Sequence, residues 1–416
     1  MTATETHRAI DAVWRIESAK LIAGLTRMVR DVGLAEDLAQ DALVAALEQW
    51  PREGIPKNPG AWLMQAAKHR AIDVLRRGSL IAGKHDALAH ELEHALEPDL
   101  DGALDEQIGD DLLRLIFISC HPVLPREAQV ALTLRLLGGL TTPEIARAFL
   151  VPEPTVAQRI VRAKKTLAEK RVPFEVPRGD ELAERLSSVL GVVYLVFNEG
   201  YSATAGDDLL RPALCDEALR LGRLLARIDP GEPEVHGLLA LMELQSSRFA
   251  ARVDANGEPV TLTDQDRTRW DREAIARGLE SLQRAESLGG ALGPYALQAS
   301  IAACHARAPS VNETDWGRIA ALYDVMAALT PSPVIELNRA VAHAMVFGPE
   351  AGLELLEPLE EELGRYHLLP TVRGDLLERL GRKDEARAEF EKAASLTENV
   401  RERTLLMARA NRLGQP

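Results

Sequence analysis

The stretch Asn58–Arg77, NPGAWLMQAAKHRAIDVLRR, decides how the first part of the chain folds. Asn58 is a helix-capping residue type, and Pro59 is tolerated at a first helical position, where its missing N–H would have no helical partner. At about 100° per residue, the apolar residues gather on one side of the predicted helix. These are Leu63, Met64, Ala67, Ala71, Val74 and Leu75. The other side is polar and basic and carries one aromatic ring; it comprises Trp62, Gln65, His69, Asp73 and Arg76, with Lys68, Arg70 and Arg77 at its flanks.

The basic side of this helix has two interpretations. Basic groups hold phosphates, and an aromatic ring stacks on an exposed base or wedges against it. A basic amphipathic helix with a half-buried tryptophan is also common on proteins that bind no nucleic acid. Taken alone, the stretch favours the second interpretation, so the rest of the chain has to decide between them.

The composition sets limits on the class of protein. The chain has 416 residues, of which 46% are hydrophobic, and this predicts two or three domains. A net charge of −14 argues against a protein that coats nucleic acid, although it allows local basic faces. Three widely separated cysteines without zinc spacing predict no metal site and suit a reducing cytoplasm. Without a signal peptide or a run of about 18 apolar residues, we expect a cytoplasmic protein with no membrane segment and no cofactor.

Helical periodicity dominates the chain, and strand-like alternation is nearly absent. Residues 7–30 are predicted to form one helix, with Ile16 among its inward residues. Residues 34–50 are predicted to form the next, which we expect Pro51 to stop. The side of this second helix that faces away from its apolar arc is largely acidic. Its members are Asp37, Gln40, Asp41, Val44 and Glu48.

Residues 79–111 are predicted to be an acidic linker. Between Asp86 and Asp111 the sequence has ten Asp or Glu residues and no Lys or Arg. One interpretation is a solvated spacer with some helical tendency. The other is a segment that mimics nucleic acid, or that repels DNA until the protein docks.

Residues 112–171 contain a helix-turn-helix pattern. Thr141 and Glu144 fit a capping box at the start of one helix, and a second helix begins near Pro154. The second helix is predicted to bury a seam of Val156, Ile160, Ala163 and Leu167 and to expose Thr155, Gln158, Arg159, Arg162 and Lys165. Short polar groups at a helix N-terminus suit base edges, and the cations beyond them suit phosphates. The alternative is an ordinary helical hairpin with a basic face.

The segment Arg171–Asp180 contains two prolines and predicts a domain boundary. Residues 180–416 follow as a helical domain. Within it, Gly348 and Gly381 each lie between two helical patterns. Their spacing is close to the tetratricopeptide period of about 34 residues, and this predicts tetratricopeptide-like stacked hairpins.

Two further segments of the helical domain stand out. Asn256-Gly257 is a hairpin signal, so we expect a long ordered loop between Arg252 and Trp270. The segment Phe197–Tyr201, FNEGY, has two interpretations. It is either a ligand site or the end of a helix with a packed tyrosine and a glycine cap.

Several stretches resemble, in the right order, parts of a bacterial RNA polymerase sigma factor of the extracytoplasmic-function type. Ala35–Trp50 is similar to the region 2.2 helix of that family, and Asn58–Arg77 to regions 2.3–2.4, which open and read the −10 element. Glu144–Leu167 resembles the region 4 helix-turn-helix, which reads the −35 element. From Gly191–Ala203 through Asp264–Trp270, the second half resembles the large helical extension of one sigma subgroup, which is tetratricopeptide-like. The chain departs from the family at Leu150, where region 4 often has glycine, at Pro154, and in its single region 2.3 aromatic residue.

The resemblance implies an all-α fold with sigma region 2 at residues 7–78, the linker at 79–111, sigma region 4 at 112–171 and the tetratricopeptide-like domain at 180–416. It implies an alternative sigma factor, not an enzyme, that binds core RNA polymerase and directs promoter-specific initiation. The C-terminal domain would regulate that activity in cis. The implied partners are the β′ clamp helices, the β flap, promoter DNA and an unknown protein or peptide held by the C-terminal domain.

The resemblance also assigns roles to surface side chains, and it implies no catalytic or metal-binding group. Those expected to bind polymerase are Asp37, Gln40, Asp41, Val44 and Glu48. Those expected at the −10 element are Trp62, Gln65, Lys68, His69, Arg70, Arg76 and Arg77. Those expected at the −35 element are Thr155, Gln158, Arg159 and Arg162 for bases, with Lys164 and Lys165 nearer the DNA backbone.

Other classes of protein stay open at this point. The main alternative is a helix-turn-helix transcriptional regulator that carries a protein-binding helical-repeat domain and does not depend on core polymerase. A repeat-based scaffold whose DNA-binding half has decayed is a further alternative, against which the cations of both DNA helices argue. No nucleophile elbow, phosphate loop, metal set or catalytic triad in the sequence supports an enzyme.

Overall fold

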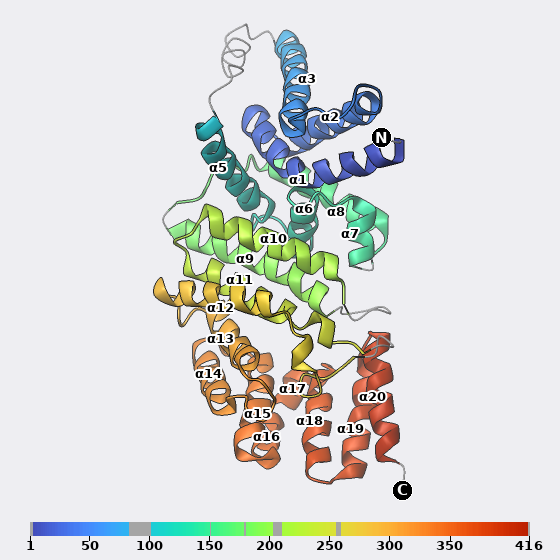
Figure 1. Cartoon of the computed structure of the whole chain (residues 1–416), viewed down its shortest axis with the longest axis vertical. Helices are drawn as coiled ribbons and strands as arrows, with labels where there is room; N and C mark the ends of the chain where they lie inside the picture. Colours follow the sequence, from blue (N-terminus) through green and yellow to red (C-terminus); the bar gives the residue numbers. More distant parts are fainter. Residues whose placement is uncertain are drawn as a thin grey trace. The chain divides into compact units, whose positions relative to one another are not determined.

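The computed structural model describes residues 3–82, 101–149, 151–178, 180–202, 210–254 and 259–414. Over these residues the chain is built of α-helices and short 3-10 turns (Figure 1). The only strand-like pairing in the described part is an antiparallel bridge between Val253 and Pro259. The all-α prediction is therefore confirmed. The chain divides into two compact units, Met1–Leu195 and Val196–Pro416. No described helix combines the length and the apolar content needed to cross a membrane.

The first unit holds the helices from the N-terminus to the first part of α9. They are α1 (Ala3–Val29), α2 (Val32–Glu53), α3 (Pro59–Ala82), α5 (Asp101–Ser119), α6 (Arg126–Leu136), α7 (Thr142–Ala148), α8 (Glu153–Glu169) and α9 (Asp180–Tyr201).

Helices α1, α2 and α3 pack against one another around buried Leu25, Leu38 and Leu63. The cap predicted at Asn58 is confirmed, because its side-chain oxygen accepts a hydrogen bond from the backbone N–H of Ala61 at 3.0 Å. The helix behind that cap carries the side chains that the sequence assigns to the −10 element.

Three sequence predictions about these helices are wrong. Ile16 and Val74 are exposed, whereas Ile72 is buried in place of Val74. Packed helices cross at an angle, so the buried side of α3 moves around the helix along its length. Helix α2 also continues through Pro51 to Glu53. Pro51 lies in the last turn, where few hydrogen bonds follow it, and Gly54 at φ +90° ends the helix instead.

Helices α7 and α8 form the predicted helix-turn-helix. Thr141 N–H donates to Glu144 Oε2 at 2.8 Å, and Glu144 N–H donates to Thr141 Oγ1 at 3.4 Å, as a capping box requires. The predicted seam is confirmed, since all four of its residues are buried: Val156, Ile160, Ala163 and Leu167. Leu150, in the turn, lies outside the described residues. So do residues 83–100 of the predicted linker. Helix α5 begins at Asp101, within that linker.

Helix α9 is shared by the two units. Its first part packs in the first unit, where Arg185 Nη2 donates to the carbonyl of Phe117 at 2.9 Å. Its last part packs in the second unit, where Cys215 Sγ lies 3.4 Å from the carbonyl of Phe197. The division between the units at Leu195 and Val196 thus falls inside a helix and not in the proline-containing segment before it.

The second unit is a succession of helices after the end of α9. They are α10 (Pro212–Ile228), α11 (Pro233–Ser246), α12 (Arg272–Ser287), α13 (Pro294–Arg307), α14 (Trp316–Leu329), α15 (Pro333–Phe347), α16 (Pro349–Leu356), α17 (Glu360–Leu363), α18 (Leu368–Arg379), α19 (Lys383–Leu396) and α20 (Val400–Leu413). Three short 3-10 turns join them: η1 (Phe249–Ala251), η2 (Arg267–Arg269) and η3 (Glu357–Leu359).

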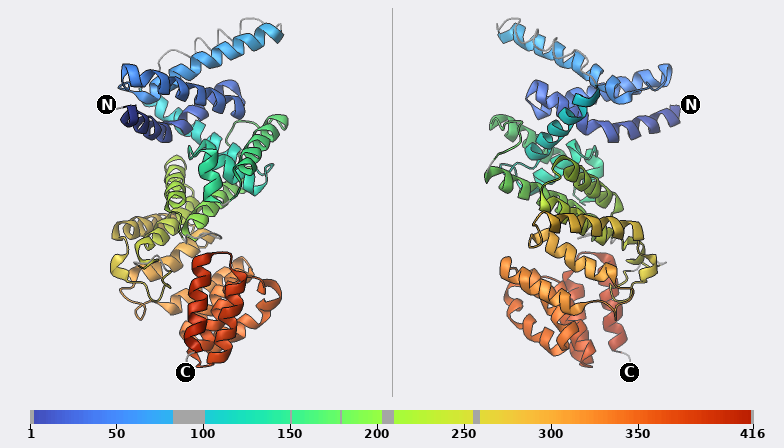
Figure 2. Two further views of the ribbon diagram at one scale, coloured as in Figure 1. Left: turned by 90° about the vertical axis from the view of Figure 1, so that its right-hand side faces the viewer. Right: turned by 60° about the vertical axis from the view of Figure 1, so that its left-hand side comes forward.

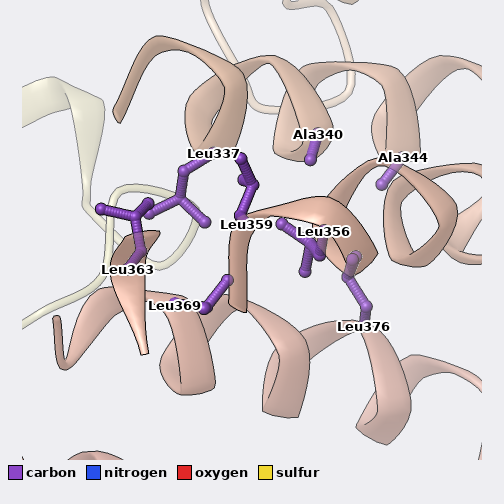
Figure 3. Close-up of a cluster of buried hydrophobic side chains, with 8 residues drawn as sticks. All are labelled: Leu337, Ala340, Ala344, Leu356, Leu359, Leu363, Leu369 and Leu376. Atoms are coloured by element: carbon purple, nitrogen blue, oxygen red, sulfur yellow. The ribbon is translucent and has the colours of Figure 1, made fainter. Parts of the chain in front are cut away.

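Helices late in the second unit pack on their neighbours in sequence. Helix α19 packs against both α18 and α20, and Figure 2 shows the three side by side. A leucine-rich cluster, with Leu356 at its centre, joins α15, α16 and α18 (Figure 3). Gly348 at φ +101° and Gly381 at φ +75° make the turns of α15–α16 and α18–α19, a backbone region that favours glycine. The structure therefore has a helical hairpin at each of the two positions from which the repeat was predicted.

The loop between Arg252 and Trp270 is ordered where it is described. The Val260 N–H donates to the carbonyl of Arg252 at 2.8 Å, beside the bridge between Val253 and Pro259. These contacts bring the two flanks of the predicted hairpin together. Its tip, Asn256-Gly257, lies outside the described residues.

Candidate nucleic-acid and polymerase interfaces

The polar side of α3 faces outward. Gln65 and His69 are exposed, and Trp62, Lys68 and Arg70 are partly exposed. The Trp62 ring meets the buried ring of Trp50 edge-on, with centroids 5.3 Å apart. One edge of Trp62 is thus held by the core of the bundle while part of the ring stays accessible. The side chains of Arg76 and Arg77 lie outside the described part of α3.

The cations of α3 differ in their surroundings. Burial lowers the pKa of Lys68, and the nearby charge of Arg27 lowers it further. Arg70 Nη1 lies 3.7 Å from Asp41 Oδ2 of α2, a loose pair between a partly exposed and an exposed side chain. Such a pair contributes little to stability, so Arg70 can leave it for a phosphate.

The acidic side of α2 is a surface, as expected. Asp37, Asp41 and Glu48 are exposed, and Val44 among them is 49% exposed. Gln40 is partly buried, and its Nε2 donates to Glu36 Oε1 at 2.6 Å. The surface thus has the apolar side chain of Val44 among three carboxylates, a combination that suits a partner with an apolar patch and basic residues around it.

Helix α8 exposes Gln158, Arg162 and Lys165, with Thr155 and Arg159 partly exposed. Lys165 Nζ has only a long contact to Glu169 Oε1, at 3.6 Å. Gln158, Arg162 and Lys165 lie opposite the buried seam, and Thr155 and Arg159 lie at its flank. A duplex lying on that side would meet polar groups near the helix start and cations further along.

Lys164 differs from the other side chains expected at the −35 element. Its ammonium pairs with Glu36 of α2, and only 19% of its side chain is exposed. Arg135 of α6 donates to the same carboxylate, from Nε to Oε1 at 2.6 Å. Burial raises the pKa of Glu36, but the two cations outweigh burial and hold that pKa below its ordinary value. In this structure Lys164 therefore joins α8 to α2.

Sequence reasoning missed Glu36 and Arg135. The signal was Glu36 itself, which lies between Ala35 and Leu38 on the apolar side of α2. A carboxylate at such a position requires a cationic partner, because burying a lone charge is costly.

A cavity of about 680 Å³ lies beside this ion-pair cluster, between the α1–α2 turn and the end of α8. Its lining includes the basic residues Arg27, Arg30, Lys164 and Arg171. Arg30 and Arg171 have φ angles of 55° and 50°, the left-handed region that non-glycine residues seldom adopt.

The segment Phe197–Tyr201 is both a helix end and part of a larger cluster. Gly200 packs so closely on α10 that an added Cβ would lie 2.7 Å from Cys215 Sγ. Tyr201 stacks on Phe197, with ring centroids 5.7 Å apart, and the side chain of Glu199 pairs with Arg211. The structure therefore gives this segment a packing role that glycine makes possible.

Models of three protein families match segments of the chain. Residues 17–80 match the model of sigma-70 region 2, and residues 114–167 match that of sigma-70 region 4. Residues 185–286 match a family of unknown function, DUF6596.

Individual relatives agree with these matches. An uncharacterized protein of Rhizobium meliloti is 46% identical over 92% of this chain and 90% of its own length. The ECF RNA polymerase sigma-E factor of Haemophilus influenzae is 31% identical over 27% of this chain. A probable ECF RNA polymerase sigma factor, SigI, of Mycobacterium tuberculosis is 28% identical over 41% of it. The chain spans 61% and 58% of the lengths of the latter two proteins.

The helix-turn-helix and the capped basic helix thus fall in the two segments that match sigma-70 regions 4 and 2, and the sigma factors that resemble this chain do so over part of its length. Over nearly its whole length, the chain belongs to the same family as the Rhizobium meliloti protein. The predicted resemblance to sigma regions 2 and 4 is thus confirmed, and the part that follows them matches a family without an assigned function.

Proposed function

We propose that the chain is an alternative sigma factor that binds core RNA polymerase, reads the −35 element and melts the −10 element. The observation that carries the proposal is the pair of helices α3 and α8. Each buries an apolar side and exposes polar and basic side chains, and each lies, except for its last two residues, within the matching sigma region.

Helix α3 would act on the −10 element. Trp62, Gln65 and His69 would meet bases of the opened strand, and Lys68, Arg70, Arg76 and Arg77 would hold its phosphates. Unstacking a base costs a few kcal/mol, which stacking on a ring and several phosphate contacts offset. The support of Trp62 by Trp50 suits this task, because a ring held in place loses little freedom on binding.

Helix α8 would read the −35 element as duplex DNA. Thr155, Gln158, Arg159 and Arg162 would reach base edges in the major groove, and Lys165 would contact the backbone. Lys164 would join them only after leaving Glu36. Region 4 would also bind the β flap of polymerase.

The acidic side of α2 would bind the β′ clamp helices. Asp37, Asp41 and Glu48 would attract basic residues of the partner, and Val44 would fill an apolar spot at the centre. Exposed carboxylates mainly raise the association rate, whereas burial of the apolar side chain lowers the dissociation rate.

Run-off transcription with purified core polymerase tests the proposal. Templates carrying genomic promoters found by transcript sequencing after overexpression of the chain are compared with versions in which the −35 or the −10 element is scrambled. We expect transcripts only when the chain is added and only from the intact promoters. A DNA-binding regulator that needs no core polymerase would bind these fragments without giving transcripts.

The second unit would regulate this activity in cis. We infer that its helical hairpins form a tetratricopeptide-like array, because Gly348 and Gly381, both at positive φ, each lie in the turn of a helical hairpin. The spacing of these turns is close to the tetratricopeptide period of about 34 residues. Arrays of this kind bind a protein or peptide on a concave surface. Because the second unit belongs to the same chain, it would act on the sigma regions at a high effective concentration.

Truncation after Leu195 tests regulation in cis, since this end keeps the compact first unit and the packing of α9 on α5. We expect run-off activity, the response in cells, or both to differ several-fold from those of the full chain. Equal activity of the two proteins in both assays would contradict regulation by the second unit.

A further inference from the structure

The second unit brings together two segments that sigma activity leaves unexplained. One is the end of α9, with Tyr201, and the other runs from Arg248 to Trp270. The ring of Tyr201 lies 5.8 Å from that of Phe249, centroid to centroid. Arg252 covers the Tyr201 ring, with its Cζ 3.7 Å from the centroid. The motifs at 197–201 and 252–270, distant in sequence, thus share one cluster.

Three arginines lie against the rings of Tyr201 and Trp270. Arg248 donates from Nη2 to Tyr201 Oη, and its Cζ lies 5.8 Å from the centroid of the Trp270 ring. Arg267 Cζ lies 5.1 Å from the same centroid. Together with Arg252 they concentrate three positive charges around Tyr201 and Trp270.

No carboxylate neutralises these charges directly. Among the described residues, no carboxylate lies within the 4.0 Å ion-pair distance of Arg248, Arg252 or Arg267; Glu402 of α20 lies farther away, where the charge of Arg252 helps to lower its pKa. Arg267 is only 6% exposed, and its guanidinium donates to neutral oxygens, including the carbonyl of Ala308 at 2.7 Å. Burial lowers the pKa of Arg267, and Arg248 lowers it further, while Glu313 opposes them at longer range.

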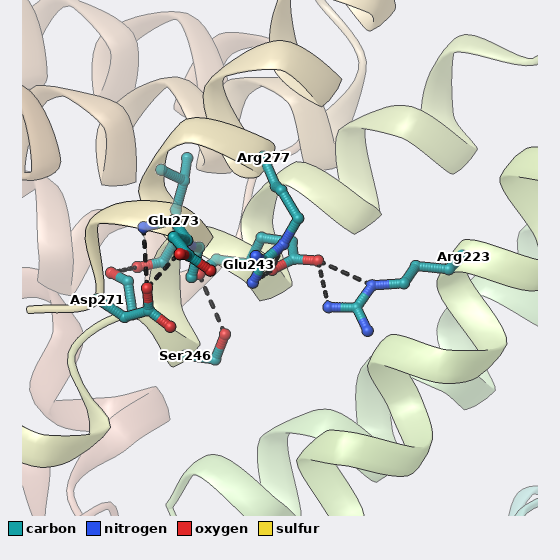
Figure 4. A network of polar contacts seen from close by, with 9 residues as sticks. Arg223, Glu243, Ser246, Asp271, Glu273 and Arg277 are labelled. Atoms are coloured by element: carbon teal, nitrogen blue, oxygen red, sulfur yellow. Dashed lines mark hydrogen bonds and ion pairs between the residues drawn. The ribbon is translucent and has the colours of Figure 1, made fainter.

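Elsewhere in the same unit, arginines pair with a buried carboxylate. Figure 4 shows Glu243, which is buried, between Arg223 and Arg277. Its carboxylate receives Arg223 Nη2 at 2.6 Å and Arg277 Nη2 at 3.1 Å. Buried charges are generally paired in this way, so the unpaired cluster is the exception.

Hydrogen-bond donors beneath the cluster also lack partners. Trp270 Nε1 and Arg267 Nε are buried, and neither has a partner in the described structure. Nδ1 of His305, whose side chain is also buried, has no partner there either, and the tautomer decides whether it is a donor or an acceptor. Burial lowers the pKa of His305 to about 4, as do Arg248 and Arg267, so the imidazole is neutral near pH 7. Leaving buried donors unpaired costs free energy, and an acceptor oxygen would recover it.

We propose that this cluster is a binding site for a small organic anion. Its carboxylate or phosphate group would lie between Arg248 and Arg252, and its apolar part against Phe249; all three side chains are partly exposed. Guanidinium forks match such oxyanions, and Arg267 beneath adds positive charge. The buried positions of Arg267 and Trp270 favour a small molecule over a macromolecule, which would need a broad exposed surface. The site stands independently of the transcription role.

The test follows the indole N–H of Trp270 in the full chain labelled with ¹⁵N-tryptophan, its signal assigned by its absence in Trp270→Phe. Potassium phosphate and sodium succinate are titrated separately, each against sodium chloride at equal ionic strength. We expect a saturable shift with at least one of the two anions and none with chloride. The arm that saturates at the lower concentration identifies the phosphate or the carboxylate class.

Two variants separate a built site from general charge attraction. Arg252→Gln should weaken binding at least tenfold, whereas Arg277→Gln removes the same charge from an arginine that already has a carboxylate partner and should change binding less than twofold. Arg248→Gln replaces Arg252→Gln if the latter disturbs cooperative unfolding. Absence of a saturable shift with both anions, or equal weakening in the Arg252 and Arg277 variants, would overturn the proposal.

Discussion

Glu36 links three helices of the first unit through one carboxylate. It lies on α2, is 2% exposed, and pairs with Arg135 of α6 and Lys164 of α8. A charge on the apolar side of a helix was visible in the sequence, but its partners were not, because they lie on helices much further along the chain. Local periodicity carries no information about such distant pairs.

The lowered pKa of Glu36 predicts how this linkage depends on pH. A carboxyl group whose pKa is lower in the folded than in the unfolded state contributes stability above its unfolded value, here 4.5. That contribution is lost as the pH falls through the folded value. We expect Glu36→Gln to cost about 1–3 kcal/mol of unfolding free energy at neutral pH, and the difference from wild type to shrink below pH 4.5.

Denaturant unfolding of both proteins across this pH range measures the difference. Glu48→Gln is the matched control, because Glu48 is exposed on the same helix and should cost almost nothing. A difference between Glu36→Gln and wild type that stays constant into acid would show that the carboxylate charge is not what holds these helices together.

At the scale of elements, α8 has some features that the sequence predicted and one, the ion pair of Lys164, that it could not predict. The buried seam and the capping box ahead of α7 were predictable, since both depend on side chains one helical turn apart. The engagement of Lys164 was not predictable, because it depends on where α2 packs. Likewise Pro51 was expected to end α2. The helix instead ends before Gly54, because only the last few backbone hydrogen bonds of the helix follow Pro51.

Arg159 of α8 provides the test of base reading. Loss of a bidentate base contact costs roughly 1–3 kcal/mol, so we expect Arg159→Ala to weaken promoters with an intact −35 element about tenfold or more. Promoters with a scrambled −35 element should change little. Lys165→Ala is the control, since an exposed phosphate contact should weaken all DNA similarly and reduce the salt dependence.

Quantitative binding assays on matched and scrambled duplexes measure both variants. Equal loss on the two kinds of duplex for Arg159→Ala would assign this residue to the phosphates and remove it from base recognition.

At the scale of the whole molecule, the helical class could be predicted because helical periodicity runs through almost the whole chain. The division into units could not, since α9 is one continuous helix whose two ends pack in different units. In the sequence, the cluster proposed to bind an anion was visible only as two separate motifs, Phe197–Tyr201 and the loop between Arg252 and Trp270. Bringing Tyr201 to Arg252 requires the packing of α9 with the loop after α11, which no local pattern encodes.

We propose that this chain binds core RNA polymerase through the acidic side of α2. The most direct test of this proposal is the affinity of the labelled full chain for purified core enzyme. We expect a saturable one-to-one complex, weakened at least tenfold, or about 1.4 kcal/mol, by Val44→Asp. Leu292→Asp alters an even more exposed apolar residue in the second unit and should leave the affinity unchanged. No saturable complex, or equal weakening by both variants, would contradict the claim.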